Sequence, residues 1–133
     1  MKKCLSFVAT AALAWISSTA FVSADELAPA DKQFLSGYEK VRVALVADDL
    51  SGAKAAAGSL GESGSGLATS SSLKEARSAF DKLSDNAKKL AKGQSGYYVV
   101  HCSMLKKDWV QTSTNIGNPY AGKEMAECGE VVK

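Results

Sequence analysis

The chain has 133 residues, of which 16 are lysine or arginine, 14 are aspartate or glutamate, three are cysteine and one is histidine. This length suits one small domain. The numbers of basic and acidic residues are nearly equal, so the net charge gives no reason to expect nucleic-acid binding. A single histidine limits any catalytic triad, and the sequence has no Cys-x-x-Cys pair, glycine-rich phosphate loop or histidine-rich motif, so we expect no enzyme.

The first 24 residues have the form of a secretory signal peptide. Lys2 and Lys3 precede an apolar stretch, Leu5 to Ile16, and Val22-Ser23-Ala24 provides a small-x-small cleavage signal. Ser18-Thr19-Ala20 is an alternative cleavage site, and the apolar stretch is near the lower length limit for an uncleaved membrane anchor. We predict cleavage after Ala24, which leaves one domain, residues 25–133, in the periplasm or outside the cell.

Cleavage there would change both the charge and the cysteine content. The 16 basic residues fall to 14 because Lys2 and Lys3 leave, and the 14 acidic residues all stay, so the net charge becomes zero. Cys4 leaves too, and Cys102 and Cys128 remain in an oxidising or metal-exposed compartment. No second apolar run is long enough to span a bilayer, so no membrane contact is expected after cleavage.

Residues 30 to 60 have helical periodicity. Apolar side chains recur at intervals of four, three and four: Phe34, Tyr38, Val41 and Leu45. One stripe of this kind predicts a helix from about Asp31 to Asp48 or Asp49. An alanine-rich stretch from Leu50 to Leu60 predicts a short second helix.

A third helix is predicted after a polar connection. Residues Gly61 to Ser71 are rich in glycine, serine and threonine and indicate a flexible link. Ser72 and Glu75 then have the spacing of a capping box, and Gly93 is a stop signal. Between them the apolar spacing alternates between three and four: Leu73, Ala76, Phe80, Leu83, Ala87 and Leu90.

The C-terminal third has a different character. Tyr97 to Val100 is aromatic and β-branched, which favours a strand, and Glu130 to Val132 is expected to return beside it. Pro119 to Cys128 predicts a short helix that Asn118 caps and Gly122 weakens. The predicted fold is therefore mostly α, a small antiparallel helical bundle with a minor two-stranded β element near the C-terminus.

Sulfur-containing side chains cluster in this third. In a strand that continues through His101-Cys102-Ser103-Met104, alternation places Cys102 and Met104 on one face and His101 on the other. Met125 and Cys128 are three residues apart and share a helical face. Thiolates and thioethers are soft ligands that select Cu(I) or Ag(I). The four sulfur residues therefore form a predicted metal site, with His101 as a weaker candidate ligand.

Two other interpretations stay open. A disulfide between Cys102 and Cys128 would close a loop of about 27 residues and stabilise the domain by roughly 3.5 kcal/mol in the chain-entropy model. The domain would then be a stapled interaction module that docks a partner through Trp109 and Tyr120, although Trp109 also suits a packing role. Methionine is common in protein cores, so either methionine is also explained without a metal.

The C-terminal motifs resemble those of the domain-of-unknown-function 3347 family. The family's pattern is Cys-Pro-Met, a tryptophan, Asn-Pro-Tyr-x-Gly and Met-x-x-Cys-Gly, and here it is matched by four segments: residues 102–104, Trp109, residues 118–122 and residues 125–129. The helical part is also similar, in Leu45 to Leu50 and in Ala76 to Phe80.

This resemblance implies an exported bacterial domain, of a kind also found attached to periplasmic adaptors of copper and silver efflux pumps. It carries a metal-ligand role onto Cys102, Met104, Met125 and Cys128. Ser103 departs from the family's proline, which puts the rigidity of the site in doubt. The sequence thus predicts a periplasmic Cu(I)- or Ag(I)-binding chaperone or sensor, with an efflux component as its expected partner.

Overall fold

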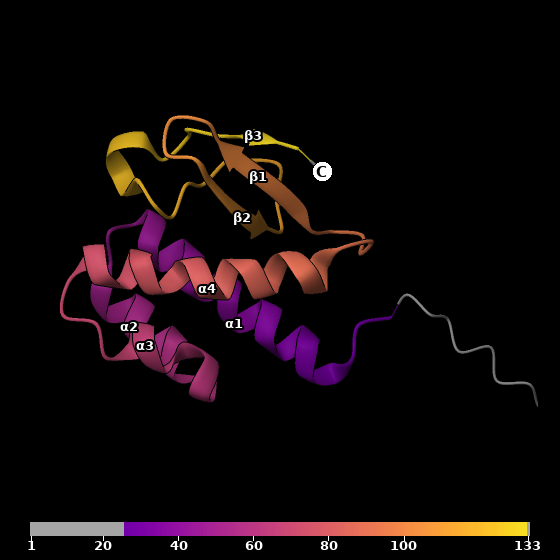
Figure 1. Cartoon of the computed structure of the whole chain (residues 1–133), viewed down its shortest axis with the longest axis horizontal. Coiled ribbons are helices and arrows are strands. Elements are labelled where there is room, and N and C mark those ends of the chain that lie inside the picture. Colours follow the sequence, from indigo (N-terminus) through magenta and orange to yellow (C-terminus); the bar gives the residue numbers. More distant parts are fainter. Residues whose placement is uncertain (1–25, 133) are drawn as a thin grey trace, which may run out of the picture.

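The computed structural model describes residues 26–132 of the chain (Figure 1). The predicted signal peptide, with Cys4 and the cleavage site after Ala24, lies outside the described residues. Among the helices of residues 26–132, none has the length and apolar character needed to cross a membrane.

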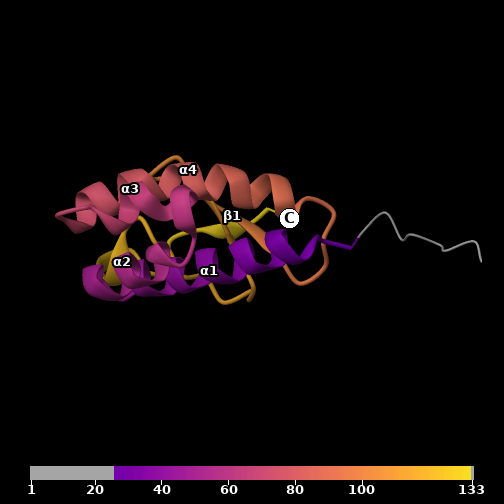
Figure 2. The same cartoon turned by 90° about the horizontal axis from the view of Figure 1, so that it is seen from below.

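Two long helices and one short helix form one layer of the fold, and all three were predicted from the sequence. They are α1 (Pro29–Val46), α2 (Leu50–Gly58) and α4 (Leu73–Ala91). Helices α1 and α4 run in opposite directions, and the sheet lies on one side of them (Figures 1 and 2). The prediction of a mostly α fold with antiparallel helices is confirmed.

The core lies between these helices and the sheet. Tyr38, Val41 and Leu45 from the predicted stripe of α1 are buried, whereas Phe34 is only partly buried. Tyr38 stacks on Phe80 of α4 with ring centroids 4.8 Å apart. Stacked aromatic rings add to the free energy gained from burying their area, so this pair fixes how α1 packs on α4.

The capping box before α4 forms in part. The Ser72 hydroxyl accepts a hydrogen bond from the Glu75 amide at 3.2 Å. The Glu75 carboxylate, however, accepts from the amide and the hydroxyl of Ser71, one residue earlier than predicted. Ser72 thus satisfies one of the amides that the first turn of a helix leaves without partners, and Glu75 fixes the residue before the N-cap.

The segment from Gly61 to Ser71 is not the flexible link that its composition predicts. It forms two short helical turns, η1 (Gly61–Gly64) and α3 (Ser65–Ala68). Leu67 is buried in the core, and a β-carbon on Gly64 would collide with the carbonyl of Ala57. Burial of one leucine and the close approach of one glycine therefore order this polar stretch.

The β element has three strands, so the prediction of two was wrong. Strand β1 (Tyr98–Cys102) lies between β2 (Lys107–Gln111) and β3 (Glu130–Val131), and both neighbours are antiparallel to it. The expected return of the chain end beside β1 is confirmed, with Val131 opposite Val100. Strand β2 is the element that the sequence did not reveal.

The predicted helix from Pro119 to Cys128 is absent from the structure. Only one 3-10 turn, η2 (Gly122–Met125), forms there. Gly122 has a φ of 62°, and a β-carbon at this position would collide with Asp48 and Arg77. The left-handed backbone at Gly122 therefore interrupts the helix, and the close approach of Asp48 and Arg77 requires a glycine at this position.

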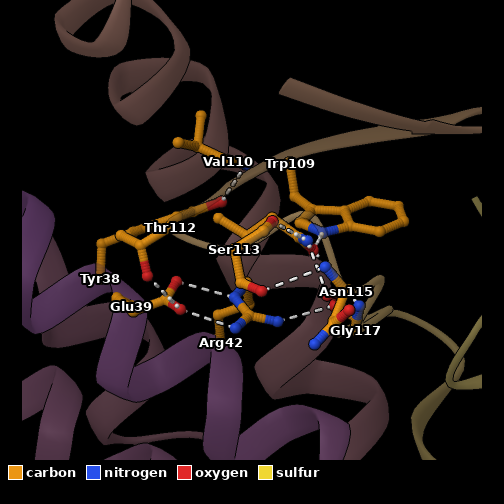
Figure 3. Close-up of polar contacts among 10 residues, drawn as sticks. Tyr38, Glu39, Arg42, Trp109, Val110, Thr112, Ser113, Asn115 and Gly117 are labelled. Atoms are coloured by element: carbon orange, nitrogen blue, oxygen red, sulfur yellow. Dashed lines mark hydrogen bonds and ion pairs between the residues drawn. The ribbon is translucent and has the colours of Figure 1, made fainter. Parts of the chain in front are cut away.

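A polar network joins α1 to the chain that follows β2 (Figure 3). The Tyr38 hydroxyl accepts a hydrogen bond from the Val110 amide at 3.1 Å. The Gln111 side chain accepts from the Trp109 indole at 2.9 Å and donates to the carbonyl of Asn115 at 2.8 Å. These buried groups find partners in one another, so the turn after β2 is fixed relative to the helices.

Candidate functional site

The candidate site lies where the C-terminal segment, residues 112–129, crosses the sheet. This segment leaves β2 at one edge and reaches β3 on the other side of β1. At its end, Gly129 lies so close to Val100 and to the Trp109 ring that an added β-carbon would be 2.9 and 2.8 Å from them. The crossing therefore covers the sheet face that carries Val100, Trp109 and Cys102.

Two arginines from the helices hold the middle of this segment. Arg42 of α1 donates to the carbonyl of Gly117 at 2.9 Å, and Arg77 of α4 donates to the carbonyl of Pro119 at 2.9 Å. Arg77 also pairs with Asp48, and this hydrogen bond, with one from the amide of Lys123, holds the pKa of Asp48 below its usual range. The segment is thus attached to both long helices on either side of Asn118.

Asn118 is fully buried and organises the crossing. Its side-chain oxygen accepts hydrogen bonds from the amides of Tyr120 and Ala121 at 2.9 and 3.2 Å. Its side-chain nitrogen donates to the carbonyl of Cys128 at 2.9 Å, and its amide also helps to lower the pKa of Cys102. One amide side chain therefore connects the turn at Tyr120 with both cysteines.

Cys102 and Cys128 meet at this point. Their sulfur atoms are 2.6 Å apart, although the two residues are separated by 26 positions in the sequence. Cys102 ends β1 and is fully buried, whereas Cys128 lies in the loop before β3 and is half-buried. The structure therefore brings together the two cysteines of the predicted site and exposes only one of them.

The surroundings of the two thiols push their pKa values in opposite directions. Burial raises the pKa of Cys102, but hydrogen bonds from Cys128, from the backbone of Leu105 and Met104, and from Asn118 outweigh it and lower the value. The hydrogen bond with Cys102 raises the pKa of Cys128. Donors that converge on a sulfur stabilise its thiolate, so these surroundings favour the thiolate form of Cys102 more than that of Cys128.

The two methionines lie beside the thiols in the chain but are held differently. Met104 is in the turn between β1 and β2, and its side chain is 72% exposed. Met125 ends η2, is half-buried, and accepts a hydrogen bond at its carbonyl from the amide of Cys128. The exposed thioether of Met104 is therefore free to change its rotamer, which a core methionine is not.

His101 points away from the thiols. It lies opposite Asp108 in the ladder, and its Nδ1 is 2.6 Å from the Asp108 carboxylate. This hydrogen bond lowers the pKa of Asp108, and Lys88 lies 3.4 Å from the other carboxylate oxygen. The predicted weaker ligand is thus engaged in a polar cluster with α4.

The two aromatic residues predicted to dock a partner differ in exposure. Trp109 is fully buried and has no surface to offer, in keeping with a packing role. Tyr120 is half-buried, and its hydroxyl donates to Ser84 at 3.0 Å. It lines a cleft of about 420 Å³ whose other walls come from α4, the β1–β2 turn and the start of β2: Lys74, Arg77, Ser78, Asp81, Leu105 and Lys107.

The fold is that of a small, mostly helical domain, and its candidate site is the pair of cysteines, Cys102 and Cys128, that the C-terminal segment brings together. No protein-family model, curated protein or solved structure matches the chain. The resemblance to the domain-of-unknown-function 3347 family therefore stays a prediction. Within residues 26–132, no cluster of three or more histidine, cysteine, aspartate or glutamate residues is placed to hold a metal ion.

Sequence reasoning missed Asn118, Arg42 and Arg77 as organisers of the site. Asn118 has a local signal, because Asn-Pro-Tyr is typical of an Asx turn, and the structure uses the side chain in that way. The arginines have none, since they look like ordinary solvated helix residues and their partners lie 42 and 75 positions away.

Proposed function

We propose that this protein is an exported domain that binds a soft monovalent ion, Cu(I) or Ag(I), through the reduced thiols of Cys102 and Cys128. The observation that carries the proposal is the meeting of the two sulfurs 2.6 Å apart, with amide donors around the buried one. Thiolates are the ligands that such ions prefer, and these donors favour the thiolate form of Cys102.

Ion binding requires a small opening of the pair. With metal–thiolate bonds of about 2.3 Å, two sulfurs on one ion stand at most about 4.6 Å apart. Cys128 is in the loop before β3 and is half-buried, so it is the residue that moves, while Cys102 is fixed at the end of β1. Met104 and Met125 are the nearest thioether donors in the chain to complete the coordination. A role as a chaperone or sensor, with an efflux component as partner, suits such a site.

A competition titration with a chromophoric Cu(I) chelator tests the proposal. We expect Cys102→Ser and Cys128→Ser each to weaken Cu(I) affinity by about 100-fold or more, because either change removes one of two thiolates. Ser103→Ala is the matched control, since Ser103 is exposed between Cys102 and Met104. Equal Cu(I) affinity in the parent and both cysteine variants would refute a thiolate site.

A separate prediction concerns Met104. Because its side chain is 72% exposed, Met104→Leu should leave the melting temperature nearly unchanged. If the thioether is a ligand, the same substitution should weaken Cu(I) binding by about tenfold in the competition titration. Unchanged affinity would remove Met104 from the ligand set and leave the two thiolates with Met125.

A permanent disulfide is the second candidate, and the same sulfur distance favours it. The domain would then be a stapled interaction module with Tyr120 and its cleft as the docking surface. A thiol count on metal-free protein, in a Cys4→Ser background, separates the two candidates. If no free thiol is found, even after purification with mild reductant and Cu(I), the metal site is excluded and the disulfide-stapled interaction module is supported.

A further inference from the structure

We infer that Cys102 and Cys128 form a thiol–disulfide exchange site, in which a low-molecular-weight disulfide reacts at Cys128, closes the pair and thereby shuts the metal site. The exchange reaction stands on the geometry of the thiols alone, and only the loss of ion binding rests on the proposed function.

Access decides which sulfur an incoming molecule meets. Cys102 is fully buried beneath the C-terminal segment, whereas Cys128 is half-buried at the end of that segment. Thiol–disulfide exchange requires the attacking sulfur to approach the S–S bond directly, so a buried sulfur is protected from external disulfides and external thiols. Cys128 is therefore the sulfur that reacts with small molecules, and Cys102 reacts only with Cys128.

The environment of Cys102 suits it to the internal step. Its sulfur is held at the end of β1, beneath the C-terminal segment and 2.6 Å from that of Cys128. The internal attack therefore needs no large movement of either residue. The closed pair reopens by the reverse route, in which an external thiol attacks Cys128 and Cys102 is the leaving group.

The reaction balances with one external disulfide. Cys128 first loses its proton, and its sulfur then attacks one sulfur of the disulfide, forms a mixed disulfide and releases the first external thiolate. The Cys102 thiolate then attacks the Cys128 sulfur, forms the internal disulfide and releases the second external thiolate. Two protein thiols are oxidised, one external disulfide is reduced to two thiols, and the protons of the protein thiols pass to the released thiolates. The closed pair has no thiolate left to bind an ion.

Oxidised glutathione is a suitable probe, in a Cys4→Ser background so that only the pair reacts. We expect the parent to form the internal disulfide, and Cys102→Ser to accumulate a glutathione adduct on Cys128. The adduct on Cys102 in Cys128→Ser should form at least about tenfold more slowly, because that sulfur is buried. Equal or faster reaction at Cys102 would overturn the assignment of Cys128 as the reactive sulfur.

A second measurement needs no cysteine variant and so does not depend on how the variants fold. The parent is mixed with oxidised glutathione, quenched in acid after short times and digested, and the adduct is located by mass spectrometry. An early adduct on Cys128 that decays into the internal disulfide supports the inference. An adduct on Cys102, or a stable adduct without closure, contradicts it.

Cu(I) titrations of the reduced and closed forms distinguish the two proposals. Closure by glutathione in a protein whose reduced form does not bind Cu(I) would remove the proposed function and leave the exchange site. If the reduced protein binds Cu(I) but oxidised glutathione does not form the internal disulfide, the exchange site would be removed and the proposed function would remain. Equal Cu(I) affinity of the closed and reduced forms would show that closure does not shut the site.

Discussion

Replacement of Asn118 by alanine should destabilise the domain by about 3 kcal/mol. The substitution leaves the part-buried amides of Tyr120 and Ala121 and the carbonyl of Cys128 without their hydrogen-bond partner, and a fully buried group without a partner costs roughly 1–3 kcal/mol, so we expect about 1 kcal/mol for each. Urea unfolding under reducing conditions measures the loss without a contribution from a disulfide. A loss of less than 1 kcal/mol would show that the crossing segment does not depend on this side chain.

Two variants sharpen this test. Asn115→Ala is the matched control, because Asn115 is exposed and uses only its backbone atoms in hydrogen bonds, so its effect should stay within about 0.5 kcal/mol. Asn118→Asp keeps the acceptor for Tyr120 and Ala121 but replaces the donor beside Cys102 with a carboxylate. We expect it to raise the pKa of Cys102, measured by thiolate absorbance across pH, which a purely structural role would not predict.

Gly129→Ala is expected to cost about 2–3 kcal/mol. The added β-carbon would lie 2.8 Å from the Trp109 ring and 2.9 Å from Val100, both fully buried and unable to retreat. Gly129 also has a φ of 150°, which residues with a β-carbon rarely adopt. Overpacking a core of this kind costs about 1–3 kcal/mol, and backbone strain adds to it. Urea unfolding is again the measurement.

The control for this substitution is Gly66→Ala. Gly66 lies in α3, and the nearest atom to an added β-carbon is 4.0 Å away, so the change should be neutral or stabilising by up to about 1 kcal/mol. A double-mutant cycle with Trp109→Phe locates the clash, because phenylalanine lacks the ring atom nearest Gly129. We expect the two losses to be less than additive. Full additivity would mean that the cost of Gly129→Ala comes from the backbone alone.

The helices and part of the sheet could be predicted from the sequence because their signals are local. The apolar spacing of α1 and α4 marks residues that the structure buries, such as Tyr38, Leu45 and Phe80. Ser72 marks the start of α4 correctly. Apolar periodicity needs only the nearest turns of the same helix, so distant parts of the chain do not alter it.

Strand β2 could not be predicted in the same way. Its first two residues, Lys107 and Asp108, have low strand preference, and each pairs with a residue of α4, Asp81 and Lys88 respectively. These ion pairs join positions at least 20 residues apart, so they cannot be predicted from a local sequence pattern. The candidate site was predicted as a set of sulfur residues, but its organiser, Asn118, depends on contacts from Arg42 and Arg77 to its neighbours.

The attachment of the C-terminal segment to α1 and α4 has a consequence for how the domain is made. The helices and the β1–β2 hairpin contain mostly local contacts, which form early, whereas the meeting of Cys102 and Cys128 must wait for the last strand. During synthesis, Cys102 therefore spends time in a nascent chain in which the C-terminal segment does not yet cover it. Any ion or oxidant encountered in that interval meets an unprotected thiol. The order in which the segments are synthesised, as well as the final geometry, therefore decides whether the newly folded domain has reduced, oxidised or metal-bound cysteines.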